Sequence, residues 1–511
     1  MKELNKIWIQ ALLFLAATVS LFFFLGFDDL ISSGPHGLHL WRQTDSLSFA
    51  TQYFNHQNSF FKPELYNLKN IDGKAACEFP ITYYLTSLLY FVFGKNTLIL
   101  KLLHLIIVGT GLFFVFRLSF HLLQDYFYAS AITLFLFTST VFNDYSFNYL
   151  PDAPALGFTF LGWYFCFRYL NNPHNNTLVT SLIFFVLAGL IKVTYLINPL
   201  SIFSLALLAI LFPKKELLEQ TQARKIVIGG VICLILVLIW NLYILYYNYL
   251  SNSTSFNTKP LPIWNLSRHQ IAEVWDYISN YWHSTYFAHS SFHLLYVILL
   301  FQIIFIRKAD RGLSMLISIL ALGSISYFIL FYSQFKDHDY YFLAFIPLVV
   351  LLLINGLKTF QNFTSNRYFH FVIKLIFSVI IIAGINYSRI KLYDRHHRAE
   401  DNFSKISALI YHNKANIESL KIPKDSKFIV APDLCPNGGL LFLDRMGWNI
   451  EKKAQITVDT INALRSLGAD YLLLMSDDSI SLPIDEISGK LIFNSNGIEI
   501  YELKKAAIKL Q

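Results

Sequence analysis

Charged residues are scarce in this chain. Of its 511 residues, 14% are Asp, Glu, Lys or Arg, whereas 55% are hydrophobic and 17% are aromatic, and the mean hydropathy is positive. This composition argues against a soluble multidomain protein and indicates a polytopic membrane protein. The formal charge is +8, but no basic stripe interleaved with aromatic residues suggests nucleic-acid binding. The excess of Lys and Arg fits the basic cytoplasmic loops of a membrane protein instead.

Familiar catalytic motifs are also absent. The sequence has no phosphate-binding Gly-rich loop ending in Lys-Ser/Thr, no His-Glu-x-x-His, no nucleophile elbow and no Cys-x-x-Cys. These absences argue against ATP-driven transport and against serine or zinc hydrolysis. The four cysteines lack metal-type spacing. We expect thiols, although Cys77 and Cys435 fall outside the cytoplasm in the topology below, which leaves a disulfide between them open.

Long apolar runs predict the transmembrane helices. The first run, Ile7 to Phe27, is too long for a signal peptide, and no small-residue cleavage site follows it. We therefore expect an uncleaved helix with a cytoplasmic N-terminus. The expected spans, about eleven in number, cover residues 7–27, 98–120, 126–147, 153–170, 178–194, 196–212, 225–248, 291–306, 313–333, 341–357 and 369–388.

The run from Pro80 to Gly94 decides the topology. With only about 15 residues and many aromatics, it fits a juxtamembrane helix better than a span. If it crossed the membrane, Asp152 would face the side opposite to Asp45. If it lies on the surface, both carboxylates face outward. The basic residues that then face the cytoplasm, as the positive-inside rule requires, are Lys214, Lys215, Arg224, Lys225, Arg307, Lys308, Arg311, Lys358 and Arg367. One basic cluster would face outward, but it precedes a long domain, where the rule weakens: Arg389, Lys391, Arg395 and Arg398.

Composition changes near residue 390. We expect residues 1–390 to form the transmembrane domain, with residues 28–97 as a first outer loop that contains juxtamembrane helices, and residues 391–511 to form a small extracytoplasmic α/β domain. The pattern there predicts two strands, Phe428 to Pro432 and Tyr471 to Met475. It also predicts two helices, one after Asn437-Gly438-Gly439 and one from Val458 to Leu467, and a hairpin formed by residues 490–493 and 498–501.

A polar cluster follows the first span. The stretch Trp41-Arg42-Gln43-Thr44-Asp45 places an arginine, an amide and a carboxylate beside the membrane surface. Asp45 is a candidate general base for an acceptor hydroxyl or amine, and the alternative is an N-cap of the helix that follows. Arg42 suits a phosphate because it stays ionised, and the alternative is an ion pair with Asp45. Trp41 and Gln43 are candidate substrate contacts.

Three further charges lie near the ends of apolar runs, where a charge is costly and marks a site. Glu78 precedes the run from Pro80, where it serves either in binding the acceptor or the phosphate head of the lipid donor, or in capping. Asp152 stands where a span begins, a favourable place for a carboxylate. Lys192 lies within an apolar run and either binds a lipid phosphate or extends to the interface.

The turn from Lys336 to Tyr341 packs a base, two carboxylates and an imidazole between two spans. We expect Asp337, His338, Asp339, Tyr340 and Tyr341 to hydrogen-bond a sugar or a phosphate. Asp-His-Asp is also suggestive of a metal site, but no partner spacing supports one. The sequence requires no cofactor and leaves a divalent metal open.

These motifs, in this order, resemble the membrane glycosyltransferases of the GT-C superfamily. The resemblance is carried by Trp41-Arg42-Gln43-Thr44-Asp45, Glu78-Phe79-Pro80, Leu150-Pro151-Asp152-Ala153-Pro154 and Gly189-Leu-Ile-Lys192, and it covers roughly residues 1 to 390. Within the superfamily, the chain is most similar to the bacterial branch related to protein O-mannosyltransferases and aminoarabinose lipid A transferases.

The resemblance implies a mainly α polytopic enzyme that transfers a sugar from a polyprenyl-phosphate carrier, with inversion, to a glycan, lipid or protein outside the cytoplasmic membrane. Asp45 resembles the catalytic carboxylate of the first loop, and Asp152 resembles a second acidic residue of the next outer loop. Arg42, Lys192 and His338 are expected to hold the donor phosphate.

Two departures from the family pattern concern the donor site and the C-terminal region. Glu78 stands where relatives carry a charged or histidine residue before proline, without a lysine or histidine beside it. In contrast to these departures, the turn Asp337 to Tyr341 resembles the His/Tyr-rich turn common late in the superfamily. The C-terminal α/β domain is not shared across the superfamily.

A transporter or flippase of a lipid-linked sugar is the alternative function. Such a protein also places buried charges on its helices and has a polar outer mouth. It does not require a long first loop with a carboxylate or an outer soluble domain, so we expect the enzyme.

Overall fold

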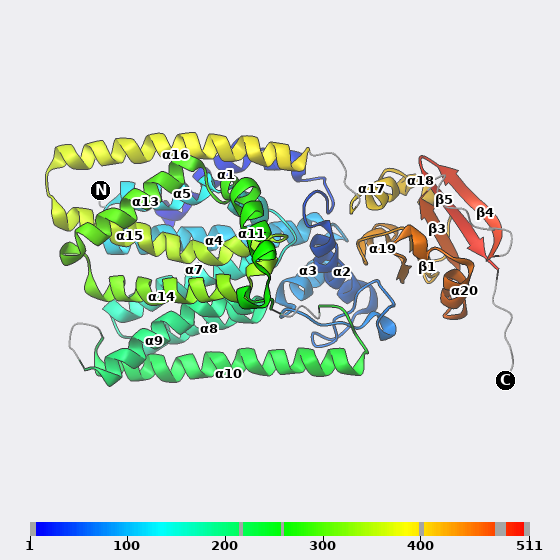
Figure 1. The fold of residues 1–511 in the computed structure, drawn as a ribbon, viewed down its shortest axis with the longest axis horizontal. Coiled ribbons are helices and arrows are strands. Elements are labelled where there is room, and N and C mark those ends of the chain that lie inside the picture. The colour runs from blue at the N-terminus through cyan, green and yellow to red at the C-terminus, as the bar shows by residue number, and fades with distance from the viewer. Residues whose placement is uncertain (1–6, 214–217, 257–259, 398–402, 476–486, 505–511) are drawn as a thin grey trace. The chain divides into compact units, whose positions relative to one another are not determined.

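The structure is a computed structural model that describes residues 7–213, 218–256, 260–397, 403–475 and 487–504. The chain forms two compact units (Figure 1). The first, here called the helical unit, comprises Met1–Ile31, Lys101–Leu242 and Thr258–Asp394. The second, here called the loop and sheet unit, comprises Ser32–Leu100, Tyr243–Asn257 and Arg395–Gln511. The lysines expected on the cytoplasmic side of the first span, within residues 1–6, lie outside the described residues, as do Lys214, Lys215 and Arg398.

Apolar helices, joined by short 3-10 turns, make up the chain outside the first loop and the C-terminal region. Their bounds are α1 Ile7–Phe24, α4 Leu98–Leu123, α5 Tyr126–Phe135, α6 Thr140–Ser146, α7 Asp152–Asn171, α8 Asn175–Ile191, α9 Ile197–Leu211, α10 Gln220–Leu250, α11 Arg268–Tyr277, α12 His283–Tyr286, α13 His289–Ile304, α14 Arg311–Leu330, α15 Ile346–Phe363 and α16 Arg367–His396. The long helices run side by side in Figure 1.

The described residues contain 7 helices that are long and apolar enough to cross a membrane, or up to 8 if a pair bent by 93° counts as one span. A mainly α polytopic membrane fold is therefore confirmed. Every predicted span coincides with a helical segment, but several, such as α8, are too short to pass this test, so the expected number of about eleven is not confirmed.

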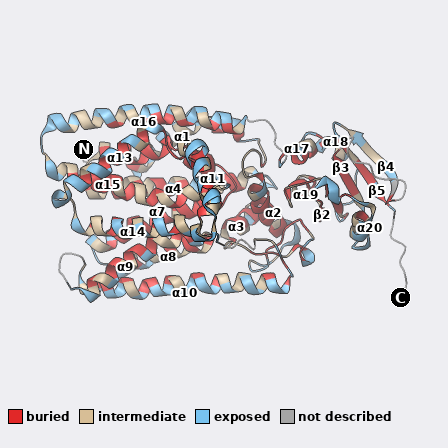
Figure 2. Cartoon of the chain, in the orientation of Figure 1, coloured by how far each residue is buried: buried red, intermediate tan, exposed pale blue. Residues whose placement is uncertain are grey.

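Most residues of helix α7 are buried (Figure 2). Glycines let it approach α4 closely. A Cβ atom at Gly157 would lie 2.7 Å from the carbonyl oxygen of Ile107, and one at Gly111 would lie 2.7 Å from that of Gly157. Small residues at such crossings are typical of helices packed in membranes.

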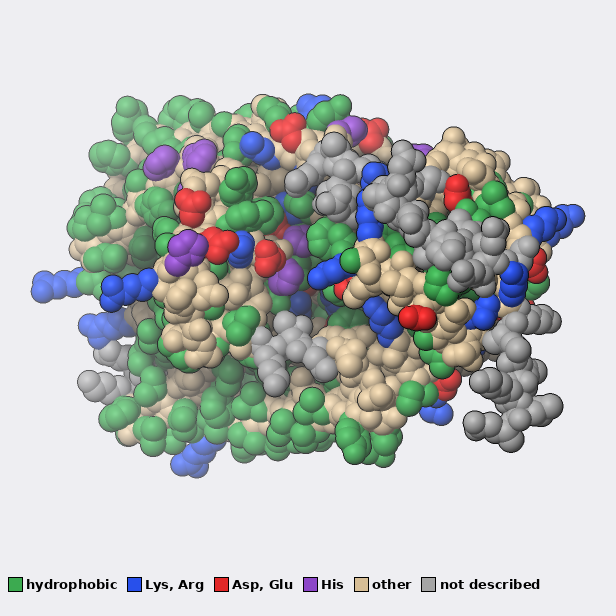
Figure 3. All heavy atoms as spheres, turned by 45° about the vertical axis from the view of Figure 1, so that its right-hand side comes forward, with side chains coloured by type: hydrophobic (Ala, Val, Ile, Leu, Met, Phe, Trp, Pro, Cys, Tyr) green, Lys and Arg blue, Asp and Glu red, His purple; other side chains and the backbone are tan. Residues whose placement is uncertain are grey.

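Other helices expose apolar side chains, as expected for surfaces in contact with lipid. Hydrophobic side chains cover wide areas of the face drawn in Figure 3. On α10 and α16 the exposed residues include Ile228, Ile232, Leu238, Ile376, Val379 and Ile382.

Two helices of the first loop belong to the loop and sheet unit, α2 Leu40–His56 and α3 Ile81–Phe93. At 13 residues, α3 is shorter than the roughly 20 residues that a span requires. The run from Pro80 to Gly94 therefore forms a helix too short to cross, as the chosen topology requires. Its N-cap is Pro80, so the interpretation that Glu78 caps this helix is wrong.

The C-terminal residues form a five-stranded sheet in the order β2-β1-β3-β5-β4. Strand β1 is parallel to β2 and β3, whereas β5 is antiparallel to β3 and β4. The bounds are β1 Phe428–Ala431, β2 Gly447–Asn449, β3 Tyr471–Met475, β4 Ser488–Ser495 and β5 Ile498–Leu503, with helices α17 Lys405–His412, α18 Lys414–Ser419, α19 Gly438–Leu443 and α20 Val458–Ser466. The predicted α/β fold is confirmed, and the short β2 is an addition to it.

Two apolar clusters hold this sheet between helices. One cluster contains Ile461 of α20, and the other contains Ile406 and Ile410 of α17 with Leu440 of α19. Tyr66 of the first loop belongs to the second cluster. The first loop therefore contributes to the core of the sheet.

Residues of the first loop also pair with the edge strand β2. Gly447 donates its N–H to the carbonyl oxygen of Tyr66 at 3.1 Å, and Leu68 donates to the carbonyl oxygen of Gly447 at 2.7 Å. A Cβ atom at Gly447 would lie 1.9 Å from the carbonyl oxygen of Phe428, so only glycine fits here. This pairing sets Asn67 against the sheet.

Candidate active site

Asp45 lies inside α2 rather than at its end. The helix begins at Leu40 with His39 as its N-cap, so the interpretation that Thr44 or Asp45 caps it is wrong. Asp45 is only 2% exposed. Its Oδ1 accepts a hydrogen bond of 2.8 Å from Nδ2 of Asn437. An amide of the C-terminal region thus contacts this carboxylate of the first loop.

Burial raises the pKa of Asp45 to about 7. The charge of Arg42 and hydrogen bonds from Asn437 and Trp41 lower this pKa, whereas the charge of Glu78 raises it. A carboxyl group that changes its charge near neutral pH can take a proton from an acceptor and release it again. The surroundings of Asp45 therefore suit a general base.

Arg42 is paired with Glu78. Its Nη2 donates to Oε1 of Glu78, which also accepts a hydrogen bond from the hydroxyl of Tyr83. The guanidinium lies 5.5 Å from the ring centroid of Phe256. Glu78, not Asp45, is thus the ion-pair partner, and Asp45 is influenced by Arg42 through its charge. The buried Nη1 of Arg42 makes no hydrogen bond to the described residues.

Gln43 and Trp41 differ in what they contact. Nε2 of Gln43 donates to the carbonyl oxygens of His36 and Leu38 at 2.6 and 2.8 Å, which fixes the loop that leads into α2. Trp41 is 46% exposed, and its side chain contributes to lowering the pKa of Asp45. Trp41 therefore offers an accessible aromatic surface next to the carboxylate.

A second polar cluster lies within the helical unit. Asp152 is the first residue of α7 and is 2% exposed. Its Oδ2 lies 3.2 Å from Nζ of Lys192, and its carbonyl oxygen accepts a hydrogen bond of 2.9 Å from the hydroxyl of Tyr195. Nζ of Lys192 also lies 5.3 Å from each of the ring centroids of Tyr340 and Tyr341. The structure thus brings four of the predicted residues together.

The remaining residues of the late turn lie in or next to this cluster. Asp339 is fully buried and its Oδ1 accepts a hydrogen bond of 2.6 Å from Tyr145. The ring of His338 stacks on that of Tyr340 at 5.3 Å between centroids. Asp337 belongs to the same turn. Among the described residues, no group of three or more His, Cys, Asp or Glu side chains is placed to hold a metal ion.

Solved structures share the fold of most of the chain. Apo ArnT from Cupriavidus metallidurans matches with a TM-score of 0.62 and 11% identity, over 96% of this chain and 97% of that chain. The complex of the same protein with undecaprenyl phosphate matches with a TM-score of 0.59, over the same shares and at the same identity.

Two further structures match less closely. The Archaeoglobus fulgidus oligosaccharyltransferase gives a TM-score of 0.52 at 13% identity, over 86% of this chain and 64% of that chain. The mycobacterial arabinofuranosyltransferase AftD gives 0.50 at 13% identity, over 96% of this chain and 39% of that chain. The fold is that of the GT-C membrane glycosyltransferases. No protein-family model and no curated protein matches the sequence.

The hydrogen bond between Asn437 and Asp45 was not predicted from the sequence. Asn437 and Asp45 are 392 positions apart, and no local pattern links them. The stretch Asn437-Gly438-Gly439 was informative only about the start of a helix, which is α19. Among the described residues the structure has no disulfide, and Sγ of Cys435 donates to the carbonyl oxygen of Phe403 at 3.2 Å.

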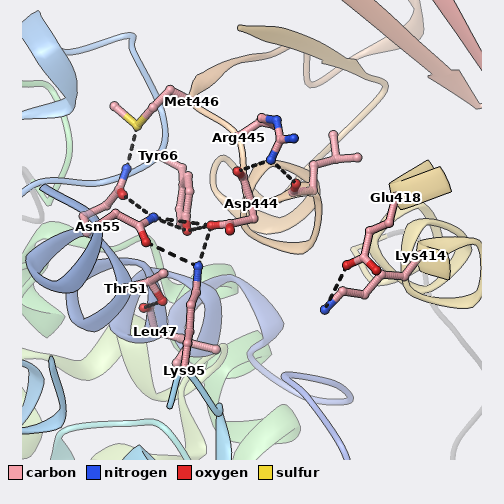
Figure 4. Close-up of polar contacts among 12 residues, drawn as sticks. Leu47, Thr51, Asn55, Tyr66, Lys95, Lys414, Glu418, Asp444, Arg445 and Met446 are labelled. Carbon is pink, nitrogen blue, oxygen red and sulfur yellow. Dashed lines mark hydrogen bonds and ion pairs between the residues drawn. The ribbon is translucent and has the colours of Figure 1, made fainter. Parts of the chain in front are cut away.

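Further polar contacts join the first loop to Asp444, the C-cap residue of α19 (Figure 4). Its Oδ1 accepts from Nζ of Lys95 at 2.7 Å, from the hydroxyl of Tyr66 at 2.5 Å and from Nδ2 of Asn55 at 3.3 Å. Burial alone would raise the pKa of Asp444, but Lys95 and these hydrogen bonds hold it below its usual value. The attachment of the loop to the sheet therefore does not depend on Asn437 alone.

Proposed function

We propose that the protein is an integral membrane glycosyltransferase. It transfers a sugar from a polyprenyl-phosphate carrier to a glycan, lipid or protein on the outer side of the cytoplasmic membrane, where residues 391–511 also lie. The observation that carries the proposal is Asp45, a buried carboxyl with a pKa of about 7, in the first loop of a fold shared with glycosyltransferases. An ArnT structure with undecaprenyl phosphate and an oligosaccharyltransferase structure with an acceptor peptide support a lipid-phosphate donor and a separate acceptor.

The proposed reaction is a single displacement. The acceptor hydroxyl or amine attacks the anomeric carbon from the face opposite the lipid phosphate, so the configuration inverts. Asp45 accepts the proton that the acceptor loses. The bond between the anomeric carbon and the phosphate oxygen breaks, and its electron pair leaves with the phosphate.

Arg42 and Lys192 are the proposed cations for the donor phosphate, with His338 as a further contact. Negative charge grows on the phosphate oxygen as the glycosidic bond breaks, and fixed cations stabilise it. Glu78 and Asp152 balance these two cations in the structure, and Asp152 also orients the acceptor or the sugar. The proposed substrate contacts are Trp41, Gln43, Asp337, Asp339, Tyr340 and Tyr341.

The test is glycosyl transfer by the purified full-length protein from a panel of polyprenyl-phosphate sugars. We expect wild type to transfer sugar and Asp45→Asn to be strongly impaired. Asp72→Asn is the matched control, because Asp72 is a carboxylate of the same loop that is 71% exposed and pairs with Lys74. Retained turnover in Asp45→Asn would refute the catalytic assignment. Movement of a lipid-linked sugar across the membrane of liposomes that contain the protein, without transfer of the sugar to an acceptor, would favour a transporter.

A further inference from the structure

Asn437 contacts Asp45 through a defined end of its amide. Its Oδ1 accepts a hydrogen bond of 3.0 Å from the backbone N–H of Asn67, while its Nδ2 donates to Oδ1 of Asp45. A backbone N–H can only donate, so the oxygen of the amide must face Asn67. The nitrogen therefore faces the carboxylate, and Asn437 acts as a donor to Asp45.

Neighbouring side chains hold Asn437 in this place. Nδ2 of Asn67 donates to Oδ1 of Asn449 at 2.8 Å, and Nδ2 of Asn449 donates to the carbonyl oxygen of Asp433 at 2.7 Å. The carboxylate of Asp433 accepts the N–H of Gly439 at 2.8 Å. Asp433 thus satisfies the start of α19, and the side chain of Asn437 does not cap it.

All members of this network are buried. Asn437 is 2% exposed, Asn67 is 4%, Asn449 is 3% and Asp433 is 0% exposed. A buried hydrogen bond of this kind has little competition from water, and its geometry is set by packing. Asn437 is therefore a preorganised donor aimed at the proposed base.

We infer that Asn437 is a positioning residue for Asp45, so that the C-terminal sheet region supplies part of the active site. This inference rests on the proposed function. The amide fixes one carboxylate oxygen and leaves the other for the acceptor proton. As a donor, it also favours the charged form of Asp45, which is the form that acts as the base.

A purely structural role would require Asn437 to be needed for attaching the first loop to the sheet. The first loop is also joined to the sheet by the pairing of residues 66–68 with Gly447 and by the contacts of Asp444. Loss of the Asn437 side chain leaves these attachments in place. We therefore expect Asn437→Ala to fold and to change the chemistry of Asp45.

The experiment measures kcat and KM against pH for the purified full-length protein with a polyprenyl-phosphate sugar that wild type uses. In Asn437→Ala we expect kcat near neutral pH to fall about 10-fold or more, as for loss of a hydrogen bond to a charged group. Because the amide lowers the pKa of Asp45, the acid limb moves to higher pH. The KM for the donor stays within about twofold.

Two variants separate positioning from folding. Asn413→Ala is the matched control, because Asn413 is a fully buried amide of the same region whose Nδ2 donates to the carbonyl oxygen of Leu409; we expect its acid limb to match wild type. In an Asp45→Asn background, Asn437→Ala should cause little further loss, because residues that act as a unit are not additive.

The outcomes distinguish the inference from the proposed function. If wild type is active and the acid limb of the pH profile of kcat is the same in Asn437→Ala as in wild type, the positioning role is refuted but the proposed function is not. So does a full additional loss from Asn437→Ala in the Asp45→Asn background. If wild type transfers no sugar from any donor, the proposed function fails and the inference fails with it.

Discussion

Asp45 and Asp152 are both 2% exposed, but they have different partners. The carboxylate of Asp45 is bonded to an amide, Nδ2 of Asn437, at 2.8 Å. That of Asp152 lies 3.2 Å from an ammonium group, Nζ of Lys192. Burial raises the pKa of Asp45 to about 7, so this carboxyl can take up and release a proton near neutral pH, whereas the carboxylate of Asp152 faces a cation. This difference in partners fits the proposed roles, with Asp45 as the base and Asp152 as the residue that balances the charge of Lys192.

The strongest test of this comparison replaces each carboxylate in turn. Asp45→Asn should lower kcat by about 100- to 10,000-fold, the usual contribution of a general base. Asp152→Asn should lower it by only about 10-fold, because the amide still orients a substrate while Lys192 loses its counter-ion. The kcat of each variant is obtained from initial rates of sugar transfer. A larger loss in Asp152→Asn would exchange the two roles.

The next test concerns the cation beside Asp152. Lys192→Gln should raise the KM for the lipid-phosphate donor about 10-fold, because a charge-assisted hydrogen bond to phosphate is lost. Lys336→Gln is the matched control, since that lysine of the helical unit pairs with the half-exposed Glu273 at 2.7 Å. Titration of each variant with donor at a fixed acceptor concentration gives the two KM values. An unchanged KM in Lys192→Gln would remove Lys192 from the donor site.

The helical positions and the charged candidates were predictable because the signals are local. Apolar runs mark helices in a membrane protein, and a charge such as Lys192 inside such a run stands out by its cost. The start of α2 was not predictable, because its N-cap residue His39 has a left-handed backbone (φ 58) and its side chain does not cap the helix.

The partners of the charges were also beyond the sequence. Arg42 pairs with Glu78 across 36 positions, and Asp45 pairs with Asn437 across 392. The second pair depends on how the first loop packs on the sheet. That packing pairs the loop with Gly447, where a Cβ atom would lie 1.9 Å from the carbonyl oxygen of Phe428. A strand of three residues, β2, carries too little pattern to be recognised.

A subtler test uses the charge of Glu78, which raises the pKa of Asp45. Glu78→Gln removes this negative charge, so the pKa of Asp45 falls. Activity requires the ionised base, so the acid limb of the pH profile should move to lower pH, opposite to the shift in Asn437→Ala. The ratio of rates at about pH 6 and pH 8 measures the shift. A shift to higher pH in Glu78→Gln would show that the limb does not report Asp45.

The smallest expected effect concerns how the first loop is attached to the sheet. Lys69 and Glu451 form an ion pair of 3.1 Å, but both side chains are 42% exposed, so Lys69→Ala should change the free energy of unfolding by less than about 1 kcal/mol. Asn67→Ala removes the hydrogen bonds that Nδ2 of Asn67 donates to Asn449 and to the carbonyl oxygen of Pro436, and it should cost about 1–3 kcal/mol. Thermal unfolding of the purified variants at low and high salt compares the two. An equal, salt-sensitive loss in Lys69→Ala would mean that exposed charge, rather than the buried amides that reach Asp45, holds the loop on the sheet.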